Sequence, residues 1–138
     1  MERITQLIAD LTEYDSIAEG LKAGKSPVEV TGLAPIHKAN LTAALAGQLH
    51  KQAVVICADD LACSRMARDL EAFSERPVEI LPAREFVFHN IESSSREYEH
   101  KRISALRNLR LGKKTIVTTV PALLMATMPP EKMQEAMF

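Results

Sequence analysis

The sequence predicts an α/β fold in which N-terminal helices precede a doubly wound, mostly parallel sheet. Short runs rich in β-branched residues alternate with stretches whose apolar residues recur at helical spacing, which is typical of parallel strands joined by helices. One run is apolar throughout, as expected for a central strand covered on both faces. The predicted strands are Val28–Thr31, Ala53–Ala58, Val78–Leu81 and Thr115–Val120.

The N-terminal segment, residues 1–26, is predicted to be helical. Its apolar residues recur at intervals of three and four, and Tyr14–Ser16 interrupts them, which predicts two short helices or one kinked helix. Gly24 is suited to end this stretch, because glycine readily adopts the left-handed backbone conformation of a helix C-cap. Residues 27–130 then form the α/β domain, and residues 131–138 begin a connection to a following domain.

Further helices are predicted between the strands. The first covers about residues 38–50, and Asp59 is a suitable N-cap for the second, because a carboxylate accepts hydrogen bonds from the amides of the first turn. The segment Ser94–Glu97 has the spacing of a capping box and opens a third helix, which Gly112 ends. A short final helix is expected to begin near Pro121.

Composition and charge exclude several classes of protein. The 138 residues suffice for one compact domain, and their 46% hydrophobic and 25% charged content is typical of a globular chain. The net charge of −1 provides no general attraction to nucleic acids or membrane surfaces. No apolar run approaches the roughly 20 residues of a membrane span, and the N-terminus does not resemble a signal peptide. The two cysteines have no metal-ligand spacing, so a cytoplasmic protein without membrane contacts is expected.

The most informative functional pattern follows the first predicted strand. A working phosphate-binding loop reads G-x-x-x-x-G-K-[ST]: its amides cradle phosphate, its lysine contacts the outer phosphates, and its hydroxyl binds magnesium. Gly32 and Lys38 occupy the first glycine position and the lysine position. His37 replaces the second glycine, Ala39 replaces the hydroxyl residue, and Pro35 removes an amide donor.

This window therefore predicts a P-loop NTPase-like (RecA/helicase-like) domain whose phosphate loop is degenerate. We expect no catalytic residue, no bound cofactor and no metal in this domain. A glycine and a lysine six residues apart also occur by chance in α/β proteins, so the spacing alone leaves a generic fold open.

Six segments resemble a known family through their order and spacing. They are Val30–Leu33, Val54–Leu61, Arg68–Phe73, Leu81–Glu85, Ser93–Leu109 and Thr115–Leu124. Together they resemble the N-terminal module of the bacterial transcription-repair coupling factors, which is similar to the nucleotide-binding domain of the excinuclease B component but has a degenerate ATP site. The resemblance covers about Val28–Pro130. Only residues 83–93 separate the third predicted strand from the next helix, which leaves no room for the DNA-clamping hairpin of the excinuclease B component.

The resemblance implies a role within a larger protein. Members of this family displace RNA polymerase stalled at DNA lesions and recruit the nucleotide excision repair machinery. Their motor, in another part of the protein, uses ATP and magnesium to move along double-stranded DNA. The excinuclease A component binds a domain adjacent to this module, and RNA polymerase binds elsewhere. The resemblance thus implies a non-catalytic scaffold, interaction and autoregulatory domain that contacts the following domains of the same protein.

Two other classes remain open from the residues alone. One is an ATP-binding lobe of a DNA helicase or of the excinuclease B component, which the retained Lys38 supports. The other is a generic Rossmann-like or response-regulator-like domain. The absence of a G-x-G-x-x-G fingerprint argues against a dinucleotide-binding version of that class.

A basic stretch on the third predicted helix is a candidate interaction patch. Its members are Arg96, Lys101, Arg102, Arg107 and Arg110. A group of basic side chains of this kind suits binding to a phosphate backbone or to an acidic partner surface. The alternative is a solvated helix face, because cations near a helix C-terminus are also stabilised by the helix dipole.

Overall fold

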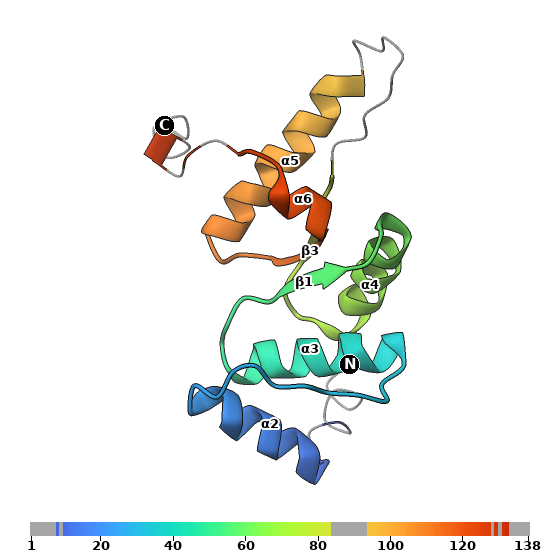
Figure 1. Ribbon diagram of the computed structural model, residues 1–138, viewed down its shortest axis with the longest axis vertical. Coiled ribbons are helices and arrows are strands. Elements are labelled where there is room, and N and C mark those ends of the chain that lie inside the picture. Colours follow the sequence, from blue (N-terminus) through green and yellow to red (C-terminus); the bar gives the residue numbers. More distant parts are fainter. Residues whose placement is uncertain (1–7, 9, 84–93, 128, 130, 133–138) are drawn as a thin grey trace.

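A computed structural model of the protein describes residues 8, 10–83, 94–127, 129 and 131–132. It confirms an α/β architecture in which helices alternate with strands (Figure 1). The elements in chain order are α2 (Thr12–Lys22), α3 (Pro35–Gln48), β1 (Val54–Cys57), α4 (Asp60–Phe73), β2 (Val78–Leu81), α5 (Ser94–Arg110), β3 (Thr115–Thr119) and α6 (Val120–Leu124). The predicted loop at residues 84–93, and all but the first two residues of the predicted connection at 131–138, lie outside the described residues.

The three described strands form a parallel sheet in the order β1-β3-β2. The middle strand, β3, is buried along its whole length, as expected for a strand with a neighbour on each side and helices on both faces. Its residues pair with both edges: Ile116 lies beside Val54 of β1 and Glu79 of β2.

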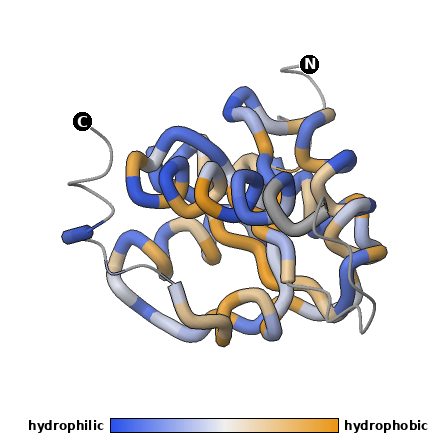
Figure 2. Tube along the Cα trace, turned by 90° about the horizontal axis from the view of Figure 1, so that it is seen from above, coloured by the Kyte–Doolittle hydropathy of each residue, from blue (hydrophilic) through white to orange (hydrophobic). Residues whose placement is uncertain are grey.

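Helices cover the two faces of the sheet unequally. On one face, Val117 of β3 packs with Leu70 of α4 and Ala39 of α3. On the other, Ile116 and Leu81 pack against Ala105 of α5. Figure 1 shows α5 and α6 on one side of the sheet and α4 and α3 on the other, with α2 outside α3. Figure 2 shows hydrophobic segments in the middle of the molecule, between segments of mixed hydropathy.

The predicted helix ends are largely confirmed. Asp59 caps α4, because its carboxylate accepts a 2.7 Å hydrogen bond from the Ala62 amide. Gly24 and Gly112 follow α2 and α5 with positive φ angles of 75° and 63°, the left-handed conformation that ends many helices. Within the described ranges, no helix combines the length and apolar character needed to cross a bilayer.

Three sequence-based expectations were wrong. Val28–Thr31 is not a strand: it has no partner in the sheet, and Val28 and Val30 are 40% and 39% exposed. Helix α3 begins at Pro35, three residues before the predicted start, because proline is well suited to the first position of a helix. Helix α2 runs through Tyr14–Ser16 without interruption, since Tyr14 packs its ring in the interior and is 4% exposed.

Candidate functional site

The segment predicted as a phosphate loop is largely the first turn of a helix. Ala34 is the N-cap of α3, and Pro35 starts the helix. The amides of His37 and Lys38 both donate to the Ala34 carbonyl, at 2.9 and 3.1 Å. A phosphate-binding loop needs amides directed at the anion, whereas these two amides are engaged in the first turn.

The loop residues have different surroundings. Gly32 keeps a positive φ of 78°, which a glycine adopts without strain. His37 and Lys38 are exposed. Ala39 is fully buried, in a cluster with Cys63, Leu70 and other apolar residues of α4 and β3. The position of the magnesium-binding hydroxyl is thus occupied by a core methyl group.

This packing predicts the effect of restoring the motif residue. Ala39→Thr adds a methyl group and a hydroxyl to a closed cluster, so we expect the free energy of unfolding to fall by about 1–3 kcal/mol. Urea unfolding measures the loss. The same substitution at Ala72, which is exposed on α4, provides the control for helix propensity. Equal losses at both positions would show that the core tolerates the larger side chain.

The predicted basic patch does not form a single surface. Arg102 was predicted to belong to this surface patch, but it is buried, with 9% of its surface exposed. Its guanidinium donates to the carbonyls of Pro82 and Ala122 at 3.0 and 2.9 Å. Lys101 is exposed and forms an ion pair with Glu97 at 2.8 Å. Arg107 and Arg110 are exposed near the end of α5, and the side chain of Arg96 lies outside the described residues.

The position of Arg102 follows from the helix geometry. Tyr98 lies one turn earlier on α5, and its hydroxyl donates to the same Pro82 carbonyl at 2.8 Å. The two side chains therefore hold the carboxyl end of β2, and Arg102 also holds α6 through Ala122. The sequence signal was present: Arg102 stands three residues before the core residue Ala105, and so near the same face of the helix.

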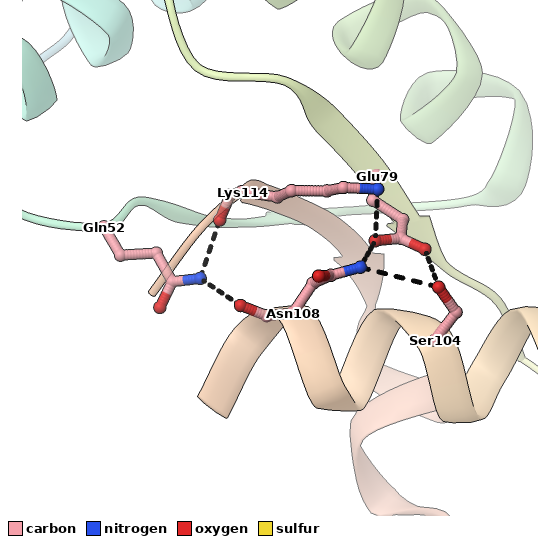
Figure 3. Close-up of polar contacts among 5 residues, drawn as sticks. All are labelled: Gln52, Glu79, Ser104, Asn108 and Lys114. Atoms are coloured by element: carbon pink, nitrogen blue, oxygen red, sulfur yellow. Dashed lines mark hydrogen bonds and ion pairs between the residues drawn. The ribbon is translucent and has the colours of Figure 1, made fainter. Parts of the chain in front are cut away.

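A polar cluster that the sequence analysis missed joins β2 to the end of α5 (Figure 3). The Glu79 carboxylate accepts from the Ser104 hydroxyl at 2.8 Å and from the Asn108 amide at 2.7 Å. Lys114 completes an ion pair with it at 3.2 Å. The Gln52 amide donates to the carbonyls of Lys114 and Asn108, at 2.6 and 3.3 Å.

The cluster stabilises the charged form of Glu79. Burial alone would raise the pKa of this carboxyl group, but the donors Ser104, Asn108 and Lys114 outweigh burial and lower the pKa below its ordinary value of 4.5. A carboxylate that accepts hydrogen bonds from three surrounding side chains suits a structural role, in which it anchors α5 to β2. A glutamate inside the run Val78–Leu81, otherwise apolar, was the signal that a specific partner exists.

The two cysteines lie where the carboxyl end of β1 meets α4. Burial and the neighbouring Cys57 thiol raise the pKa of Cys63 to about 12, so this thiol stays protonated at neutral pH. Cys63 lies in α4 and packs in the core cluster with Ala39, Leu70 and Val117. Within the part of the chain that the structure describes, no three His, Cys, Asp or Glu side chains form a group that suits a metal ion.

These features define the class of the protein as an α/β domain with a small parallel sheet, whose buried polar contacts join secondary-structure elements. No family model matches the chain, and no solved structure matches it. Over 131 residues, 94% of its length, the chain is 26% identical to the transcription-repair-coupling factor of Bacillus subtilis (strain 168). It spans 11% of the length of that protein. The similarity indicates a relationship to part of a transcription-repair coupling factor.

Proposed function

We propose that this chain is a non-catalytic module at the N-terminus of a transcription-repair coupling factor, similar to the nucleotide-binding domain of the excinuclease B component. The observation that carries the proposal is the similarity to such a factor over 94% of the chain. In this proposal the whole protein displaces RNA polymerase stalled at DNA lesions and recruits excision repair. The module acts as a scaffold, an interaction surface and an autoregulatory element.

The geometry of the degenerate loop supports the non-catalytic part of the proposal. Two amides needed for a phosphate cradle, those of His37 and Lys38, are engaged in α3, and Ala39 packs in the core. ATP and magnesium then belong to the motor of the parent protein. The excinuclease A component is reached through the adjacent domain, and RNA polymerase and double-stranded DNA through other parts.

Calorimetry with magnesium and ATP tests the non-catalytic role. We expect no binding heat from the natural chain, and none from a variant that combines His37→Gly with Ala39→Thr, because the amides remain helical. Circular dichroism must show that the variant is folded. Binding by the natural chain with a micromolar Kd would contradict the proposal, and it would favour the ATP-binding lobe suggested by Lys38.

A second experiment tests the family role. In the full-length protein, ATP-dependent release of a stalled RNA polymerase is measured before and after this module is exchanged for the matching segment of the Bacillus subtilis factor. We expect release in both cases, since the two segments are proposed to be equivalent. Deleting the module is expected to raise the rate of ATP hydrolysis, because the module is proposed to restrain the motor. A full-length protein without polymerase-releasing activity would refute the assignment.

A further inference from the structure

The amino ends of the parallel strands meet on one side of the molecule, where three segments of the chain converge. The segment before β1 is joined to the end of α5, since the Gln52 amide donates to the carbonyls of Asn108 and Lys114 at 3.3 and 2.6 Å (Figure 3). The segment before β2 reaches the same place, because the Thr115 amide donates to the Pro77 carbonyl at 3.0 Å. Three segments are therefore neighbours in space: residues 50–53, 75–79 and 107–115.

These three segments concentrate positive charge. Their six lysine and arginine residues, which we call the amino-edge patch, are Lys51, Arg76, Arg107, Arg110, Lys113 and Lys114. The same segments contain two acidic residues, Glu75 and Glu79, and the carboxylate of Glu79 is neutralised by its ion pair with Lys114. The patch is thus positive in a chain whose net charge is −1.

Most of the amino-edge patch is accessible to a partner. Its exposed members are Lys51, Arg107, Arg110 and Lys113. Among the described residues, no carboxylate lies within ion-pair distance of Lys51, Arg107 or Lys113. A helix dipole stabilises cations in the last turn, but Lys51 and Lys113 each lie beyond the last residue of the preceding helix. The dipoles of α3 and α5 therefore do not account for these two lysines.

We propose that the amino-edge patch binds the phosphate backbone of double-stranded DNA without reading its sequence, in addition to the contacts that other parts of the protein make with DNA. The inference rests on the proposed function, in which the whole protein acts on DNA. Lysine and arginine side chains bind a duplex by neutralising phosphates and releasing the counterions condensed along it. The three segments contain no Phe, Tyr or Trp on which unpaired bases could stack, which favours a duplex over a single strand.

An acidic protein surface suits the amino-edge patch less well. The centre of an interface between proteins is apolar and depleted of charged residues, lysine among them. In the three segments Leu111, 42% exposed, is the one large apolar residue with an exposed surface. Interfaces with DNA are more polar and much more positively charged. The composition of the patch therefore favours a phosphate backbone.

Fluorescence anisotropy with the 138-residue chain tests the proposal. With a labelled DNA duplex of about 20 base pairs at about 50 mM salt, we expect saturable binding with a Kd of roughly 10⁻⁴ to 10⁻⁶ M. Each neutralised phosphate contributes about −0.9 to the slope of log affinity against log salt concentration, so the exposed cations predict a slope of about −2 to −4. The absence of saturable binding would overturn the proposal. Tighter binding of poly-L-glutamate than of DNA would also overturn it, because the partner would then be an acidic protein surface.

A variant of the patch sharpens the test. Combining Lys51→Gln, Arg107→Gln and Lys113→Gln removes three exposed charges and is expected to weaken DNA binding at least about tenfold, with a salt slope near −1. Substitutions at exposed positions of this kind change stability little, and circular dichroism checks that the variant is folded.

A matched control removes the same charge elsewhere. Lys25→Gln, Arg65→Gln and Arg68→Gln affect exposed residues outside the patch, and together they are expected to weaken DNA binding less than about threefold. Equal losses in the two variants would overturn the proposal, because the overall charge and not the patch would then govern binding. DNA binding by this chain needs no repair activity, so a failure of the full-length protein to release RNA polymerase would refute the proposed function separately.

Discussion

Replacing Arg102 with alanine is expected to lower the free energy of unfolding by about 2–4 kcal/mol, because buried hydrogen bonds from a charged donor are lost together with the packing of the side-chain stem. The guanidinium joins three elements: it lies on α5 and bonds the Pro82 carbonyl after β2 and the Ala122 carbonyl in α6. Tyr98 still donates to Pro82 in the variant, whereas Ala122 loses this donor. Urea unfolding measures the loss, and hydrogen exchange in α6 should rise more than in β1.

Two further substitutions separate charge from geometry. Arg102→Lys keeps the charge but cannot reproduce the planar fork that bonds two carbonyls, so we expect an intermediate loss. Arg107→Ala removes an exposed arginine from the same helix and should change stability by less than about 0.5 kcal/mol. Similar losses for Arg102→Ala and Arg107→Ala would mean that burial of the guanidinium contributes nothing.

Elements with local signals were predictable from the sequence. The strand at Val78–Leu81 has the predicted bounds, and Asp59 caps α4 as its position before a helical pattern indicated. These features depend on neighbours within a few residues along the chain. The parallel arrangement also followed from the alternation of strands and helices.

Features that depend on distant partners were not predictable in the same way. Val28–Thr31 has strand-like residues, but a strand also needs a neighbour, and the described sheet provides none for it. Arg102 was interpreted as a surface cation because charge alone does not reveal two backbone carbonyls twenty residues away in either direction. The interpretation of residues 32–39 as a degenerate phosphate loop stays a prediction, and the sequence did not show that Ala39 belongs to the core.

The Glu79 cluster predicts a specific loss of stability in acid. The folded-state pKa of Glu79 lies below its ordinary value of 4.5, so the protein favours the charged form more strongly than the unfolded chain does. This contribution is fully present above that ordinary value and is lost as the pH falls through the lower folded pKa. Urea unfolding between about pH 6 and pH 3 should therefore show declining stability, part of which is removed in Glu79→Gln.

Substitution of Glu79 is also expected to be costly at neutral pH. In Glu79→Gln the Ser104 hydroxyl must reorient to accept from the new amide nitrogen, the remaining hydrogen bonds lose their charge assistance, and Lys114 loses its counter-charge. We expect the free energy of unfolding to fall by about 1–3 kcal/mol. Glu97→Gln is the matched control, since that carboxylate pairs with Lys101 on the exposed face of α5 and should affect stability little. If both variants lost stability in acid as the natural chain does, the Glu79 cluster would not be a source of the acid dependence. The end of α5 would then have to be held to β2 by apolar contacts alone.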